Sequence, residues 1–319
     1  MNDLLAGTSL IIGIAAANAA QDKIGFKEFL ESTPPIEELV YEFVPTYTNQ
    51  PAQSYFVRWQ NGAYVVRRSP KLSWVTEPLT SASVTEDWIS GKYGSNWWKI
   101  TPGPTADVKF WSWIDTGGPA SRTNNLVWPA VQSSIRGPTH LLHFGINLIP
   151  LGEVRWEGNL LTYTNTDLNA SVDARVSFQG ERPEFVLQSM HNLRRNLPKD
   201  VPRVTHFRIE YEYGTGDVPT NLPSGFRTFW LKDEGKPPRE GRHYIIHKLK
   251  LAEKPLGAAS FGPQQFYGQL PVTRFVVLPS GAYFQNESNR WERMLQPVSP
   301  LIYDPELEKL KKNPPKSLF

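Results

Sequence analysis

Residues 55–68, with the sequence YFVRWQNGAYVVRR, decide the fold class that we predict for this chain. Tyr55, Val57 and Trp59 alternate with Phe56 and Arg58, and this period of two is that of a β-strand. Asn-Gly is the dipeptide that a tight type I′ hairpin turn favours, because both of its central residues need a positive φ. The segment therefore predicts a β-hairpin whose strands cover residues 55–60 and 63–68.

Similar patterns recur along the whole chain. Two further hairpins are predicted, one turning at Glu157-Gly158-Asn159 and one at Pro279-Ser280-Gly281. Additional strands are predicted over residues 73–76, 97–101, 108–114, 171–178, 185–190, 206–213, 227–231 and 244–251. Turn signals every roughly 8–15 residues are typical of an antiparallel meander or barrel. We therefore predict a mainly β protein, with a large antiparallel curved sheet or incomplete barrel and a few short helices.

Helical patterns are few and short. Phe26, Phe29 and Leu30 form one apolar stripe, and Ser32-Thr33-Pro34-Pro35 ends that helix because proline lacks the N–H group that a helix needs. Residues 36–40 follow as a helical or extended piece. Other short helices are expected near residues 125–135, 139–148 and 305–312. No low-complexity linker divides the chain, so we expect a single β-rich domain over residues 20–303, followed by a C-terminal helix and mobile tail over 304–319. Two packed halves are the alternative.

The N-terminal segment predicts export. Residues 4–20 are mostly small or apolar, and they end in Ala17-Asn18-Ala19, the pattern that signal peptidase cleaves. The preceding residues include Asp3 but no Lys or Arg, which departs from the usual basic start. We expect residues 1–19 to be a signal peptide, with an apolar helix packed on the domain as the alternative. No second apolar segment approaches spanning length, so we expect a protein that is not integral to the membrane.

Composition and missing motifs limit the chemistry. With 34 Lys and Arg against 31 Asp and Glu, the net charge of +3 does not indicate a nucleic-acid partner. The chain has 0 Cys, which excludes disulfides and thiolate sites and fits a bacterial periplasm better than a disulfide-rich secreted scaffold. His243 and His247 lie on a predicted strand, where that spacing of ~13 Å is too large for one metal ion. Nucleophile, phosphate-binding and dinucleotide motifs are missing, so we predict no metal, no cofactor and no catalytic residue, and favour a protein that is not an enzyme.

Aromatic residues gather in one part of the chain. The candidates for ligand binding there are Tyr93, Trp97, Trp98, Trp111 and Trp113. Three interpretations remain open. The rings fill a core or line a barrel, they form an exposed platform that stacks on sugars, or they line an apolar cavity for acyl chains.

The order of features at the N-terminus resembles the bacterial outer-membrane lipoprotein carrier family. A signal peptide and a short amphipathic helix precede a hairpin whose second strand runs from Gly62 to the sequence Arg67-Arg68-Ser69-Pro70. The resemblance implies an incomplete barrel with helices over its mouth, and a concave face that holds the acyl chains of a lipid or lipoprotein. In such proteins one arginine pins the lid. Arg58 and Arg155, which precede hairpin turns, are the candidates, with surface arginines beside a core Trp as the alternative.

Two functions follow as hypotheses. The first is a periplasmic, non-enzymatic binding protein whose half-barrel holds an apolar small molecule, a lipid or a lipoprotein acyl chain. The second is a structural component of the cell envelope that presents an aromatic surface to a glycan or a protein.

Overall fold

The computed structural model describes residues 24–46, 51–83, 87–94, 96–102, 108–114, 142–146, 154–165, 170–192, 204–231, 238–267, 269–278, 281–285 and 290–293. Their strands form one 16-stranded sheet. The strands are β1 (Ile36–Pro45), β2 (Gln53–Gln60), β3 (Ala63–Ser69), β4 (Trp88–Tyr93), β5 (Asn96–Pro102), β6 (Val108–Ile114), β7 (Arg155–Glu157), β8 (Leu160–Asn165), β9 (Ala170–Gln179), β10 (Arg182–Asn192), β11 (Val204–Glu212), β12 (Gly225–Leu231), β13 (Arg239–Leu251), β14 (Val272–Leu278), β15 (Gly281–Gln285) and β16 (Trp291–Arg293). One helix, α2 (Phe26–Ser32), and the 3-10 turns η1 (Leu72–Trp74), η2 (Ala258–Phe261) and η3 (Pro263–Phe266) complete the described elements.

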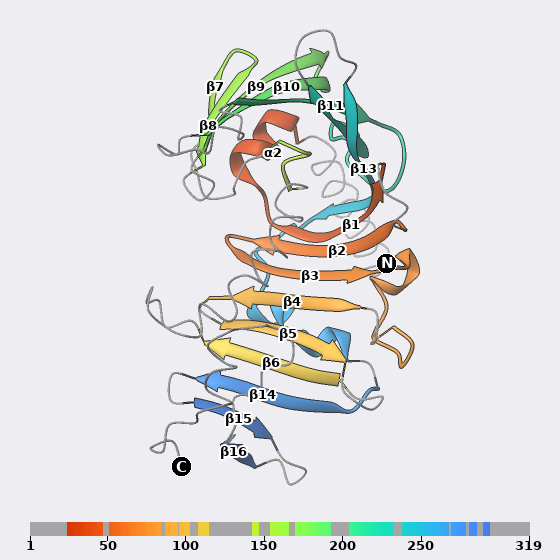
Figure 1. Cartoon of the computed structure of the whole chain (residues 1–319), viewed down its shortest axis with the longest axis vertical. Helices are drawn as coiled ribbons and strands as arrows, with labels where there is room; N and C mark the ends of the chain where they lie inside the picture. Colours follow the sequence, from red (N-terminus) through yellow and green to blue (C-terminus); the bar gives the residue numbers. More distant parts are fainter. Residues whose placement is uncertain are drawn as a thin grey trace, which may run out of the picture.

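The strand order is β16-β15-β14-β6-β5-β4-β3-β2-β1-β13-β12-β11-β10-β9-β8-β7. Neighbouring strands are antiparallel except β6 and β14, which are parallel. The half of the sheet that contains β1 and β7–β13 curves around α2, while β2–β6 and β14–β16 continue as a flatter extension (Figure 1). The edge strands β7 and β16 are three residues long. The predicted fold class, a large curved antiparallel sheet with few short helices, is confirmed.

The hairpin at Asn61-Gly62 forms as predicted. Asn61 and Gly62 have φ values of 47° and 81°, and Trp59 pairs with Tyr64 across the turn. The strand predicted over residues 73–76 is wrong. The chain there forms the 3-10 turn η1, and Val75 packs in a hydrophobic core on one face of the sheet. Residues 36–40 are extended and belong to β1.

Helix α2 has the predicted apolar stripe. Phe26, Phe29 and Leu30 are each 1% exposed. The helix ends where Thr33 takes a left-handed conformation and donates its backbone N–H to Phe29 O over 2.9 Å, just before the two prolines. Of the helix expected near residues 139–148, the structure describes only 142–146, where Leu142 is helical and residues 143–145 form a turn. The helices expected near 125–135 and 305–312, the signal peptide and the tail over 304–319 lie outside the described residues. In the described parts, no helix is both long and apolar enough to cross a bilayer.

Two hydrophobic cores lie on opposite faces of the sheet. The inner core is on the side that faces α2, and the outer core is on the opposite side of β1–β5. Val65 packs in the outer core and its neighbour Val66 in the inner core, since successive strand residues point to opposite faces. These middle strands are therefore covered on both sides, and each fully buried aliphatic or aromatic side chain there stabilises the fold by about 1.5–3 kcal/mol.

Gly145 provides a first test of this packing. It has a φ of +86°, and a Cβ atom added there would lie 2.8 Å from the Phe226 ring and 3.3 Å from Ile209. We expect Gly145→Ala to lower the free energy of unfolding by about 1–3 kcal/mol, because backbone strain and overpacking both act at this position. Urea denaturation checks the value. The matched control is Gly180→Ala, which has the same left-handed backbone but open space around its Cβ position. Equal losses in both variants would contradict a packing role for Gly145.

Candidate functional site

An aromatic row crosses the inner face of the curved sheet. It consists of Tyr55, Tyr41, Tyr244, Phe226 and Tyr211, which lie on five successive neighbours, β2, β1, β13, β12 and β11. The strand register places Tyr41 opposite Tyr55, and Phe226 opposite both Tyr244 and Tyr211. The ring centroids of Tyr41 and Tyr55 are 4.7 Å apart, as are those of Phe226 and Tyr244. The row forms a continuous apolar wall with hydroxyl groups at several positions.

Two short segments of the same chain fill the space in front of this wall. We call α2 together with residues 142–146 the plug. Phe144 contacts both helix rings, with centroid distances of 5.7 Å to Phe26 and 5.1 Å to Phe29. Phe26 also lies 5.5 Å from Tyr211, so the aromatic row continues from the sheet into the plug. Figure 1 shows α2 enclosed by the arc of the curved strands. The inner core is thus closed by a seven-residue helix and a turn.

Lys27 attaches the plug to the turn between β7 and β8. Its Nζ donates to Gly158 O over 2.7 Å and reaches Asn159 Oδ1 at 3.5 Å. The same ammonium group lies over the rings of Trp156 and Phe178, at 4.9 Å and 5.3 Å from their centroids. Helix α2 has no side-chain cap at its N-terminus. Apolar packing therefore provides most of the attachment of the plug, and Lys27 adds an exposed polar link at its rim.

Burial raises the pKa values of two tyrosines on the inner wall. Burial raises the pKa of Tyr41 well above its usual value, and the neighbouring Tyr55 and Tyr244 raise it further. Burial likewise raises the pKa of Tyr211. The Tyr211 hydroxyl finds no hydrogen-bond partner in the described part of the chain. Such a hydroxyl offers a buried ligand one hydrogen-bonding group on an otherwise apolar surface.

A different segment covers the outer face. Residues 252–266, which we call the cover, place Phe261 and Phe266 against the outer core. Arg58 ties the cover to the sheet: its Nε donates to Glu37 O over 2.9 Å, and its Nη1 donates to Ser260 O over 2.7 Å and to Gln265 Oε1 over 2.6 Å. The arginine singled out in the sequence as a candidate for pinning a lid thus holds the cover, and its predicted role in ligand binding stays a prediction.

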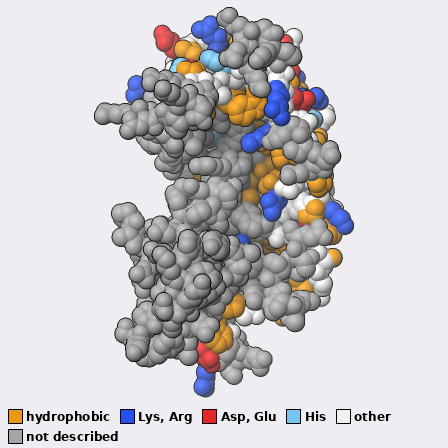
Figure 2. Space-filling model, in the orientation of Figure 1, with side chains coloured by type: hydrophobic (Ala, Val, Ile, Leu, Met, Phe, Trp, Pro, Cys, Tyr) orange, Lys and Arg blue, Asp and Glu red, His pale blue; other side chains and the backbone are white. Residues whose placement is uncertain are grey.

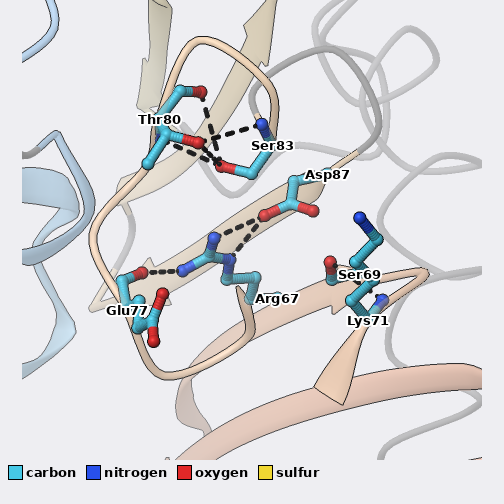
Figure 3. A network of polar contacts seen from close by, with 7 residues as sticks. All are labelled: Arg67, Ser69, Lys71, Glu77, Thr80, Ser83 and Asp87. Atoms are coloured by element: carbon cyan, nitrogen blue, oxygen red, sulfur yellow. Dashed lines mark hydrogen bonds and ion pairs between the residues drawn. The ribbon is translucent and has the colours of Figure 1, made fainter. Parts of the chain in front are cut away.

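A buried ion pair fixes the loop between β3 and β4 on the same face. The Arg67 guanidinium donates to Asp87 Oδ2 from Nε over 2.8 Å and from Nη2 over 2.5 Å, and it also donates to the backbone oxygen of Glu77 (Figure 3). The side chains of Arg67 and Asp87 are 0% and 1% exposed. Thr80 and Ser83 close the adjoining turn through reciprocal contacts, with Thr80 N donating to Ser83 Oγ over 2.9 Å. Sequence reasoning missed this pair, because Arg67 and Arg68 are adjacent and look alike in the sequence.

Of the aromatic candidates from the sequence, Tyr93 and Trp98 have described side chains. Trp98 is 4% exposed, lies against Gly91, and donates Nε1 to Phe261 O over 2.8 Å. Tyr93 is 45% exposed and its ring centroid lies 5.8 Å from that of Phe261. Both therefore adjoin the cover on the outer face.

The remaining candidates lie at three places in the sheet. The backbone of Trp97 pairs with that of Trp113, and the backbone of Trp111 pairs with that of Lys99, on β5 and β6. Their side chains are outside the described residues. Arg155 is exposed on β7, at the far edge of the sheet from β16. The structure does not bring Arg155 together with the aromatic candidates, and a ligand role for any of these residues remains a prediction.

Comparison with solved structures gives a likeness in fold. No protein-family model matches the chain, and no curated protein matches it. The structure is similar to the crystal structure of a LolA superfamily protein from Nitrosomonas europaea, with 11% sequence identity and a TM-score of 0.37, over 76% of this chain and 99% of that chain. At this TM-score the likeness assigns neither a family nor a function to the chain.

Proposed function

We propose that this protein is a non-enzymatic binding protein that holds an apolar ligand, such as a lipid or the acyl chain of a lipoprotein, against the inner wall of its curved sheet. The continuous aromatic row, which extends from five strands into the plug, carries the proposal. An acyl chain needs an apolar surface of this kind and no directed hydrogen bonds. Export to a periplasm, predicted from residues 1–19, belongs to the same proposal.

The ligand reaches the wall when the plug leaves it. A seven-residue helix is too short to be stable by itself, so α2 depends on the contacts that Phe26, Phe29 and Leu30 make with the inner core. An apolar ligand would make equivalent contacts with the same wall. Exchange of the plug for the ligand therefore replaces one set of apolar contacts by another, and Lys27 is the polar link that has to break.

Two experiments test the proposal. Mass spectrometry of the protein purified gently from its native host should detect a co-purifying lipid or acyl chain. In the second, N-phenyl-1-naphthylamine, which fluoresces in apolar surroundings, should bind saturably and be displaced by a fatty acid.

A linked variant tests whether the ligand enters beneath the plug. The double variant Lys27→Cys, Asn159→Cys introduces the only two thiols in the chain, so a short bismaleimide can link α2 to the β7–β8 turn.

The unlinked double variant is the matched control for the linked protein. We expect linking to reduce binding of the fluorescent probe at least tenfold, because the plug can no longer leave the wall. Equal binding by linked and unlinked protein would show that the ligand does not enter beneath the plug. Absence of any co-purifying lipid, together with no probe binding, would contradict the proposed function.

A further inference from the structure

Charges on the outer face of the curved sheet are paired. Lys250 Nζ lies 2.9 Å from Glu37 Oε2, Lys248 Nζ 2.7 Å from Glu38 Oε2, and His247 Nε2 2.8 Å from Glu42 Oε2, all between β13 and β1. Further along the same face, Glu212 accepts from Arg227 over 2.8 Å and lies 3.2 Å from His243. These five basic side chains on the outer face are thus matched by carboxylates.

The inner face at β3–β5 has the opposite character. Arg68 lies two residues beyond Val66 of the inner core, and Lys99 alternates with Trp98 and Ile100 of the outer core, so both cations are on the inner side. Strand residues of β2–β5 on this face with described side chains are Gln53, Tyr55, Val57, Trp59, Tyr64, Val66, Arg68, Ser90, Lys92 and Lys99, and none of them is acidic. Among the described residues, no carboxylate forms an ion pair with Arg68 or Lys99.

The two cations act on each other across the sheet. Ser90 on β4 pairs directly with Lys99 on β5 and with Val66 on β3, the strand that carries Arg68. Burial lowers the pKa of Lys99, and the positive charge of Arg68 lowers it further. A half-buried cation beside a second cation is unfavourable for the unliganded fold, and an anion placed between them would relieve both the repulsion and the lost hydration.

A buried hydroxyl group lies at the same place. Ser90 is 3% exposed, and its Oγ has no hydrogen-bond partner in the described part of the structure. Serine Oγ can donate one hydrogen bond to an oxyanion, and guanidinium and ammonium groups donate stronger, charge-assisted ones. Among the described residues, no carboxylate accepts a hydrogen bond from any of these three groups.

We infer that Arg68, Lys99 and Ser90 bind the oxyanion of a negatively charged amphiphile, such as an alkyl phosphate, whose apolar part lies along the aromatic row. Tyr55 connects the two parts: its ring stacks on Tyr41 of the row, and the positive charge of Arg68 acts on its hydroxyl, opposing the rise in the Tyr55 pKa that burial causes. Arg242 adds a third positive charge near Tyr55. This inference rests on the proposed function, since it names the chemical class of the ligand for the same inner wall. On the face drawn in Figure 2, several Lys and Arg side chains lie beside hydrophobic ones.

The test compares ligands that have the apolar chain, the phosphate group or both. Decyl phosphate and 1-decanol have the same chain, and inorganic phosphate has the same anion without a chain. Binding is measured by displacement of N-phenyl-1-naphthylamine and by calorimetry for the wild type, Arg68→Gln, Lys99→Gln and Ser90→Ala. The control is Arg175→Gln, an exposed arginine on the opposite face of β9.

We expect wild type to bind decyl phosphate at least 10-fold more tightly than 1-decanol, and each cation variant to lose roughly 10-fold to 100-fold for the phosphate only. Ser90→Ala should lose less, and Arg175→Gln should retain wild-type affinity. If both amphiphiles bind equally and the variants change nothing, the inference is overturned while the proposed function stands. If inorganic phosphate binds with the same dependence on the variants but no amphiphile does, the anion site is supported and the proposed apolar ligand is overturned. If no ligand binds, both are overturned.

Melting temperature gives a second readout that does not depend on the ligand. Lys99→Gln removes a half-buried charge beside Arg68, so the unliganded variant should melt at the same or a higher temperature than wild type. A lower melting temperature would show that Lys99 has a structural partner, and would overturn the assignment of its charge to ligand binding.

Discussion

Asp87→Ala is expected to lower the free energy of unfolding by about 3–5 kcal/mol, because it leaves the guanidinium of Arg67 buried without its counter-charge. Both side chains are at most 1% exposed, so water cannot replace the lost carboxylate without opening the structure. The remaining contact of Arg67, with the backbone oxygen of Glu77, does not neutralise the charge. Equilibrium unfolding in urea, followed by fluorescence, measures the loss.

The double variant Arg67→Met, Asp87→Leu is the control. It removes both charges and keeps apolar volume, so it should recover most of the stability that Asp87→Ala loses. A loss of less than about 1 kcal/mol in Asp87→Ala would show that the pair is hydrated and behaves as a surface ion pair. Limited proteolysis adds a local readout, since we expect cleavage within residues 72–83 to become faster once Arg67 no longer holds that loop.

Phe29→Ala is expected to destabilise the protein by a similar amount, about 3–5 kcal/mol, and to make it responsive to ligand. The ring of Phe29 is 1% exposed, and its centroid lies 5.1 Å from that of Phe144 within the plug. Its removal leaves an apolar space against the inner wall, and spaces of this kind stay dry and bind small apolar molecules. A ligand at 100 times its dissociation constant should restore about 2.7 kcal/mol.

Phe261→Ala is the matched control for this prediction. Phe261 is 0% exposed, but it lies in the outer core beneath the cover. Its truncation should lower stability as much as Phe29→Ala does, without rescue by N-phenyl-1-naphthylamine or a fatty acid. Rescue of both variants, or of neither, would contradict the placement of the ligand on the inner side of the sheet. Thermal melts with and without ligand provide the comparison.

Local sequence patterns predicted the elements well. Asn61-Gly62 fixed the first hairpin, because its turn geometry is determined by two neighbouring residues. The alternation over residues 108–114 matched β6, and the stripe of Phe26, Phe29 and Leu30 matched α2. The strand predicted over 73–76 is wrong because tertiary contacts decide the conformation there. Val75 and Leu79, in the loop between β3 and β4, both pack against the outer core.

The candidate site could be predicted only in part. Tyr55, Tyr41 and Tyr244 become neighbours through the register of β2, β1 and β13. β1 and β2 are consecutive strands, but β13 is far from both in the sequence, so its pairing with β1 has no local signal. Arg67 and Arg68 show a second difficulty, because two neighbouring residues of one strand can have very different surroundings. One is buried beside Asp87 and the other is exposed on the inner face, because alternation along β3 sends the two side chains to opposite faces. The apolar run Tyr64-Val65-Val66 indicates that β3 is buried on both faces at these positions, since strands buried on both faces lose the alternation with polar residues.

The length of the edge strands has a consequence for self-association. The described sheet ends in β7 and β16, each three residues long. A long edge strand, by contrast, would offer many unpaired backbone groups to a second molecule. Short edges give an incoming chain few backbone positions to hydrogen-bond, which is one of the ways in which natural sheets resist amyloid-like stacking. Lengthening β7 would therefore offer a second molecule more backbone positions to pair with, and we expect it to promote self-association.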